Sequence, residues 1–239
     1  MDSTTTTMTL IDLFMIGGIF MWPLLVFSII TVALILERAI FFIYYNLNLK
    51  GLSKNVLDVL KNKDINKAIS YCEKAPKRQI GAKVILEGLK VSKYGEDMME
   101  KVINAEAAEM ITKLENGFDI LTAMGSLSPL TGFLGTVSGM ISAFSAIANA
   151  TDVNAQLVAG GIFEALITTV YGLIIAIIAI SGYSVLAHIV DKFANDIESI
   201  STDVITTIII NNENVINENI IKDEKNDEKN EDENKQFIV

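Results

Sequence analysis

The sequence predicts an all-α membrane protein with three transmembrane helices, and two observations support this fold class. The chain of 239 residues is 51% hydrophobic, and its mean hydropathy is positive, at +0.42. Charged residues are absent from three long stretches, which cover residues 13–36, 120–151 and 165–190. A helix of about 20 apolar residues is long enough to cross a bilayer, so each of the three stretches can hold one spanning helix.

The distribution of Lys and Arg predicts the orientation of these helices. Residues 1–37 contain no Lys or Arg, and residues 46–116 contain thirteen. Residues 114–190 again contain none, and the tail from residue 191 contains five. Loops rich in Lys and Arg stay in the cytoplasm. We therefore expect an outward-facing N-terminus (1–13), a first transmembrane helix with its cytoplasmic end (14–45), a cytoplasmic helical region (46–116), a second transmembrane helix (117–148), an outward-facing loop (149–156), a third transmembrane helix with a cytoplasmic extension (157–210) and a tail (211–239).

The cytoplasmic segments have helical patterns. Asp64 is a suitable N-cap for a helix in the first half of residues 46–116. The segment 96–124 contains no Pro and one Gly, and is expected to run unbroken into the second span. Beyond the third span, apolar residues recur at spacings of 4, 4, 4, 3, 4 and 4, which predicts an amphipathic helix. They are Val185, Ile189, Phe193, Ile197, Ile200, Val204 and Ile208.

The acidic tail explains much of the net charge of −10. Residues 191–239 hold thirteen acids and five lysines and are rich in Asn. Such a segment buries too little apolar surface to offset the entropy of ordering, so residues 211–239 are expected to be disordered. We favour a solvated tail over a binding site for a basic partner, and nothing suggests a nucleic-acid ligand.

Small residues line one face of both the second and the third predicted spans. Small side chains at spacings of 3 and 4 let two helix backbones approach closely in lipid. The residues expected to serve helix packing are Pro129, Gly132, Gly135, Gly139, Ala165, Gly172 and Ala176.

A carboxyl group, that of Glu164, stands out within the third span. A charged carboxylate deep in a bilayer costs about 3 kcal/mol or more, and no basic residue is available at that depth. We expect Glu164 to face a protein-lined interior through which a proton or cation passes. The alternative is a carboxyl that reaches the outer interface or stays protonated. Thr136, Thr168 and Thr169 could line the same path or simply bond to their own helices.

Enzymatic motifs are not found in the sequence. The single histidine, His188, has no Ser or Cys motif near it, and no phosphate-binding loop or paired carboxylates occur. The single cysteine, Cys72, excludes an intrachain disulfide and is expected to be a small core residue. We therefore expect no enzyme activity, no cofactor and no metal site.

Two long motifs resemble the MotA/TolQ/ExbB proton channel family, in its ExbB-like branch. Pro129–Gly139 matches the family pattern P-L-x-G-x-L-G-T-V-x-G, and Glu164–Ile177 matches E-A-L-x-x-T-x-x-G-L-x-x-A-I. The Glu37–Arg38 pair also resembles the end of the family's first span. The similarity extends to about residue 205, whereas Tyr171 and the acidic tail depart from the usual pattern.

The resemblance implies a function that composition alone does not give. Family members form a pentamer around a single-span partner, ExbD or TolR, whose membrane aspartate takes up and releases the proton. Proton flow is coupled to mechanical work on a TonB-like or TolA-like protein, here for import across the outer membrane. Thr136 and Thr169 match the family's pore threonines and Glu164 its third-span glutamate, while Thr168 is outside the usual pattern. The chain would be a multi-pass protein of the bacterial inner membrane.

Two alternative functions remain open at this stage. A flagellar stator subunit of MotA type has four spans and a larger cytoplasmic loop, so the three predicted spans count against it. A non-conducting membrane scaffold could use the same small-residue faces but would have no need of the polar set Glu164, Thr136 and Thr169.

Overall fold

The computed structural model describes residues 10–62, 64–76, 78–149 and 155–236, and over these residues the chain forms helices and no strand. The chain divides into two compact units, residues 1–41 with 115–189 and residues 42–114 with 190–239. Among the described residues, three helices are long and apolar enough to cross a membrane. The all-α fold with three candidate spans is therefore confirmed.

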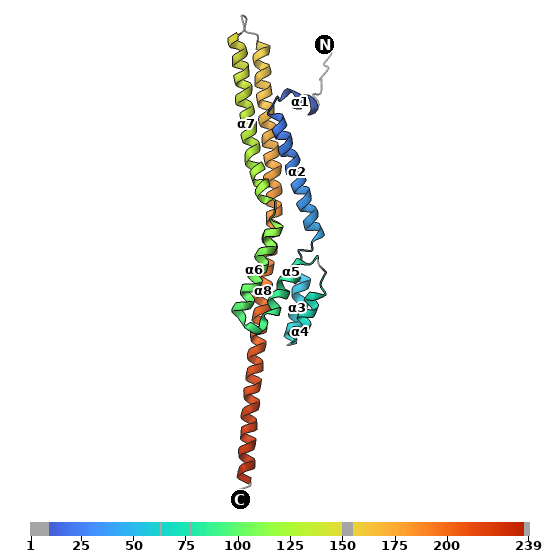
Figure 1. Ribbon diagram of the computed structural model, residues 1–239, viewed down its shortest axis with the longest axis vertical. Coiled ribbons are helices and arrows are strands. Elements are labelled where there is room, and N and C mark those ends of the chain that lie inside the picture. The colour runs from blue at the N-terminus through green and yellow to red at the C-terminus, as the bar shows by residue number, and fades with distance from the viewer. Residues whose placement is uncertain (1–9, 63, 77, 150–154, 237–239) are drawn as a thin grey trace, which may run out of the picture. The chain divides into compact units, whose positions relative to one another are not determined.

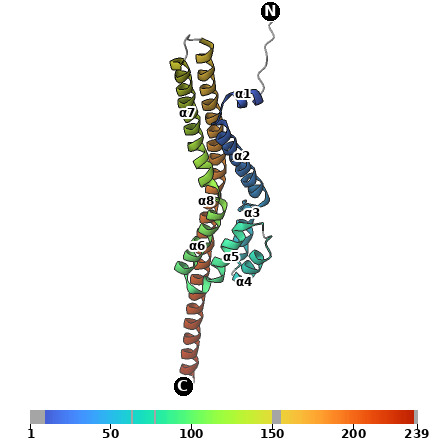
Figure 2. The same ribbon diagram turned by 45° about the horizontal axis from the view of Figure 1, so that its top comes forward.

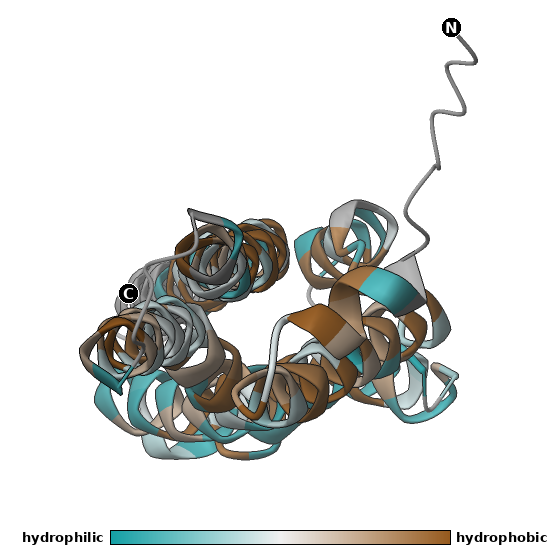
Figure 3. Cartoon of the chain, turned by 90° about the horizontal axis from the view of Figure 1, so that it is seen from above, coloured by the Kyte–Doolittle hydropathy of each residue, from teal (hydrophilic) through white to brown (hydrophobic). Residues whose placement is uncertain are grey.

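The first unit contains the membrane-spanning segments. Its helices are α1 (Leu10–Ile16), most of α2 (Met21–Tyr44), α7 (Phe118–Asn149) and the first part of α8 (Ala155–Gln236). α7 and the first part of α8 lie side by side in both ribbon views (Figure 1, Figure 2). Seen from above, the helices carry both hydrophobic (brown) and hydrophilic (teal) residues (Figure 3).

Two glycines with positive φ interrupt the helices of this unit. Gly18 (φ +68°) separates α1 from α2, so the first span begins at Met21 rather than near residue 14. Gly117 (φ +86°) separates α6, which ends at Leu114, from α7. The prediction of an unbroken helix into the second span is therefore wrong. Left-handed backbone at these two positions ends a helix, and glycine adopts it at little cost.

The second unit is a small helical domain. It contains α3 (Lys50–Lys61), α4 (Ile65–Glu73), α5 (Ile80–Lys90), the 3₁₀ turn η1 (Ser92–Tyr94), α6 (Glu96–Leu114) and α8 from residue 190. Successive helices from α3 to α6 pack on one another. Asp64 caps α4 as predicted, because its carboxylate accepts a hydrogen bond of 2.9 Å from the backbone N–H of Lys67. Cys72 is buried in α4, which confirms it as a core residue.

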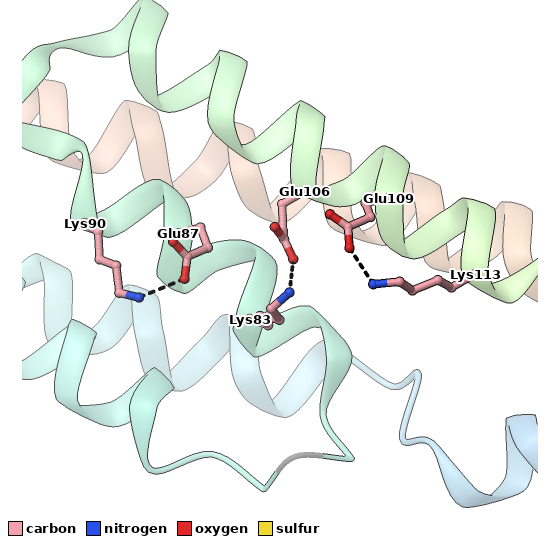
Figure 4. A network of polar contacts seen from close by, with 6 residues as sticks. All are labelled: Lys83, Glu87, Lys90, Glu106, Glu109 and Lys113. Carbon is pink, nitrogen blue, oxygen red and sulfur yellow. Dashed lines mark hydrogen bonds and ion pairs between the residues drawn. The ribbon is translucent and has the colours of Figure 1, made fainter.

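Ion pairs form within and between α5 and α6 (Figure 4). Lys83 of α5 pairs with Glu106 of α6 and so joins the two helices. The hydrogen bond to Glu106 raises the pKa of Lys83. The Lys90–Glu87 pair, at 2.8 Å, lies within α5.

The second part of α8 packs with its apolar stripe inward. Phe193, Ile197, Ile200, Val204 and Ile208 are all buried, as the pattern predicts, whereas Val185, in the first unit, is 63% exposed.

The structure differs from the sequence prediction in the tail. α8 continues to Gln236 and so includes most of residues 211–239, for which disorder is predicted. The sequence contains no Gly or Pro after Gly182. The two residue types that disfavour a helix most are therefore absent from the rest of α8.

Candidate functional site

The backbones of α7 and α8 meet at glycines. A Cβ atom placed on Gly132 would lie 2.8 Å from the carbonyl oxygen of Thr168 and 3.0 Å from the Cα of Thr169. On Gly172 it would lie 2.5 Å from the carbonyl oxygen of Ser128. On Gly139 it would lie 3.0 Å from both the Gly161 carbonyl oxygen and the Ala165 Cβ. Any side chain at these glycines would push one backbone away from the other.

The other small residues have less uniform surroundings. Gly135 faces the side chain of Thr168, whose Cβ would be 2.7 Å from an added Cβ. Ala165 and Ala176 are 2% and 5% exposed, so both are fully packed. Pro129 lies inside α7, where it supplies no N–H to the helix.

The three threonine hydroxyls all donate to backbone carbonyl oxygens. The single hydroxyl hydrogen of Thr168 is shared between two carbonyl oxygens, that of Ala165 in its own helix at 2.8 Å and that of Gly132 of α7 at 3.3 Å. Thr169 Oγ1 donates to the same Gly132 oxygen at 3.2 Å. Thr136 Oγ1 donates to Phe133 in its own helix at 2.7 Å. Thr136 therefore takes the local bond that the sequence left open as an alternative, whereas Thr168 and Thr169 join α8 to α7.

Glu164 lies about 140° around α8 from Thr169, against the corner between α1 and α2. A Cβ atom on Gly18 would overlap Glu164 Oε1 and lie 3.0 Å from Glu164 Cδ. The corner is held by an apolar cluster of Met21, Leu24, Ile167 and Ile175, on which α1 also packs. Glu164 is partly exposed. Within the described part of the chain, no hydrogen bond or ion pair is found for its carboxyl group.

The structure therefore separates the predicted polar set into two parts. At 100° per residue, Thr168 is about 40° around the helix from Glu164, whereas Thr169 is about 140° away. Thr168 and Thr169 converge on Gly132, and Glu164 points to Gly18. A lumen in a ring of subunits that is lined by Glu164, Thr136 and Thr169 stays a prediction.

The Glu164 carboxyl group can exchange protons, and the threonine hydroxyls can solvate a polar path. A carboxyl group can take up and release a proton, and each threonine oxygen keeps a lone pair free to accept a further hydrogen bond. His188 is exposed and lies 24 positions after Glu164. No group of residues suited to a metal ion occurs among the residues described.

One element of the site was missed from the sequence, namely the Gly17–Gly18 corner. The signal was present as a pair of adjacent glycines inside an apolar stretch, which is typical of a break between helices. Its relation to Glu164, about 146 positions later, has no sequence signal.

The sequence is similar to a known protein family and to several of its members. The MotA/TolQ/ExbB proton channel family matches residues 75–199, which include all of α7 and the spanning part of α8. "Putative biopolymer transport protein ExbB-like 1" of Synechocystis is 32% identical over 188 residues, or 77% of this chain and 73% of that protein. "Biopolymer transport protein exbB1" of Vibrio cholerae is 30% identical, with 73% of this chain and 78% of that protein covered.

A relative from the Tol system shows similarity over a shorter stretch. The "Tol-Pal system protein TolQ" of Haemophilus influenzae is 38% identical over 109 residues, or 46% of this chain and 47% of that protein. The family match and the two longer similarities agree with the two motifs around Thr136 and Glu164. The chain therefore belongs to the MotA/TolQ/ExbB proton channel family.

Proposed function

We propose that this subunit couples the proton gradient to mechanical work on a TonB-like or TolA-like protein, for import across the outer membrane. The coarser statement, that it is a proton-channel motor subunit of ExbB/TolQ type in the inner membrane, follows from the family. The import role is supported by the relatives named as biopolymer transport proteins.

Glu164 is the residue on which the proposal depends. It is the only charged residue between Asp152 and Asp191, and a carboxyl at that depth is costly unless it serves a polar path. It also occupies the position of the third-span glutamate in the family motif. We assign to it the exchange of protons along the path, and to Thr136, Thr168 and Thr169 a polar wall.

Partners are needed to complete the path. The charge-free stretches of the three spans, residues 13–36, 120–151 and 165–190, contain no second acid that could relay a proton from Glu164. We propose a single-span ExbD-like or TolR-like partner that supplies a membrane aspartate, surrounded by a ring of five copies of this chain. Many apolar side chains on the spans are exposed in the single chain, among them Leu130, Phe133 and Ile141, and such faces suit lipid or neighbouring subunits.

The proposed orientation places the N-terminus in the periplasm and the C-terminus in the cytoplasm. It is supported by the thirteen Lys and Arg residues within residues 46–116.

The direct test replaces Glu164 with Ala and with Gln in cells whose growth requires energised uptake. Both variants are expected to lose growth while the complex still assembles, because neither side chain exchanges a proton. Glu73→Gln, at an exposed position of α4, is the matched control and should grow normally. Full growth of both Glu164 variants would contradict the proposal.

A scaffold function is the second candidate, and one observation favours it. The hydroxyls of Thr136, Thr168 and Thr169 all bond to carbonyl oxygens, as they would in a helix pair built for packing alone. A scaffold would retain its partner and full activity after Glu164→Gln. The stator alternative is disfavoured because the described residues hold three candidate spans, whereas that type has four.

A further inference from the structure

The corner between α1 and α2 is built so that the chain passes close to α8. The N–H of Met21 donates to the carbonyl oxygen of Gly18 at 3.2 Å, which closes a tight turn. A Cβ on Gly17 would lie 2.5 Å from Met21 Cγ and 3.3 Å from Ile167 Cγ2. Phe14 and Trp22 pack edge to face across the turn, with ring centroids 5.5 Å apart. The corner is therefore a packed element and not a loose connection.

Gly18 is the part of the corner that meets the functional carboxyl. Its φ of +68° already favours glycine. The absence of a side chain has a second consequence, because a Cβ there would overlap Glu164 Oε1 and crowd Cδ at 3.0 Å. The Glu164 Cγ would be 3.6 Å away, which is an ordinary contact. Only the carboxyl end of Glu164 uses the space that Gly18 leaves.

We propose that Gly18 is a positioning residue for Glu164, and that the α1–α2 corner sets where the carboxyl exchanges its proton. The proposal rests on the proposed function of Glu164. The backbone at Gly18 lies against the carboxyl group of Glu164 and limits where it can lie. The apolar cluster that contains Met21 and Ile167 packs this backbone against α8. A side chain at Gly18 would displace the carboxyl group while leaving its chemical identity unchanged.

The test measures proton flux into liposomes that contain the complex purified through a tag on this chain. Gly18→Ala should lower the flux about tenfold or more, since displacement of a reacting group by about 1 Å can cost up to about a hundredfold in rate. Gly117→Ala is the matched control. It has the same kind of positive φ (+86°), but its Cβ would meet only Leu34, at 3.4 Å, and Arg38, at 4.0 Å.

Rescue distinguishes positioning from a general structural effect. Glu164→Asp shortens the side chain by one methylene and withdraws the carboxyl from Gly18. The double variant Gly18→Ala with Glu164→Asp should therefore conduct several times faster than Gly18→Ala alone. A defect caused by backbone strain would not be relieved by a shorter residue at position 164.

The pattern of results separates the two proposals. If Glu164→Gln abolishes flux but Gly18→Ala conducts like Gly117→Ala, the positioning role is wrong and the function of Glu164 stands. If Glu164→Gln conducts like the natural protein, the proposed function itself fails. If Gly18→Ala is slow and the double variant no faster, strain explains the defect and the positioning role is also wrong.

A cysteine pair tests the contact without the overlap of Gly18→Ala, because Glu164→Cys removes the carboxyl group that a Cβ at position 18 would meet. Gly18→Cys combined with Glu164→Cys should be joined by a short bifunctional thiol reagent in native membranes. The control pair is Gly18→Cys with Leu166→Cys, because Leu166 is exposed on another face of α8. Equal cross-linking of both pairs, or none for the first pair, would overturn the proposed contact.

Discussion

Replacement of Gly132 by Ala should separate α7 from α8. The added Cβ would lie 2.8 Å from the carbonyl oxygen of Thr168, whereas ordinary contact begins at 3.4 Å. The neighbouring atoms are backbone atoms, so no side-chain rotation can relieve the overlap. The two helices must instead move apart by about 0.6 Å, the distance needed to restore ordinary contact.

This movement has two costs. Overpacking of a tight interface typically costs about 1–3 kcal/mol. The bonds from Thr168 and Thr169 to the Gly132 oxygen are already 3.3 and 3.2 Å long, and a further 0.6 Å or so would break them, at about 0.6 kcal/mol each in a membrane protein. We therefore expect Gly132→Ala to be about 2–4 kcal/mol less stable than a control that changes only helix propensity.

Gly160→Ala is that control. Gly160 lies in α8, and no atom lies within 4 Å of a Cβ added there. Gly160→Ala therefore gains the same helix propensity as Gly132→Ala, about 1 kcal/mol, without a steric overlap. The free energy of unfolding of both variants would be measured by titration of mixed micelles with a denaturing detergent. Equal stability of the two variants would refute direct backbone packing at Gly132.

Three further predictions concern other parts of the chain. Gly125→Ala should cost less than Gly132→Ala in the same titration, because its Cβ would meet the movable side chain of Ile180, at 2.8 Å, and not backbone; an equal cost would contradict this. Burial raises the pKa of the Cys72 thiol to about 11, so alkylation at pH 8 should be about a hundredfold slower than for a free thiol and accelerate as the pH rises toward 11; rapid labelling of the native protein would disprove it. Asp64→Ala should lower the thermal midpoint while Asp64→Asn largely preserves it. Since hydrogen bonds with Lys67 lower the pKa of Asp64, the natural protein should keep this contribution above about pH 3.8 and lose it as the pH falls through the lowered pKa.

The spans and the contact between α7 and α8 were predictable because each depends on local chemistry. Stretches without charge identify helices that can enter lipid, and small residues at spacings of 3 and 4 identify a face that can pack closely. Gly132, Gly139 and Gly172 show this directly, since each lies against backbone of the other helix.

The direction of Glu164 was not predictable for a different reason. Glu164 and Thr169 belong to one sequence motif. Because they are five residues apart, their side chains point about 140° apart around the helix. The contact with Gly18 depends on how the α1–α2 corner folds back on α8, which is set by the cluster of Met21, Leu24, Ile167 and Ile175. Contacts between such distant segments leave no periodic pattern in a single sequence.

Helix ends were the other source of error. Gly18 and Gly117 both adopt positive φ and end helices that hydropathy alone would join. Gly117 is a lone glycine in a helical pattern, which is compatible with either outcome because a glycine costs only about 1 kcal/mol in a helix interior. The adjacent Gly17 and Gly18 are the stronger signal of a break.

The central claim is that the Glu164 carboxyl exchanges the protons that pass through this subunit. The most direct measurement is the rate of acidification of liposomes that hold the purified complex, with Glu164→Gln compared against the natural protein at equal assembly. We predict that the natural complex conducts and that Glu164→Gln reduces the rate about tenfold or more, because the amide does not release and take up a proton as a carboxyl group does. Equal rates in the two complexes would contradict the claim.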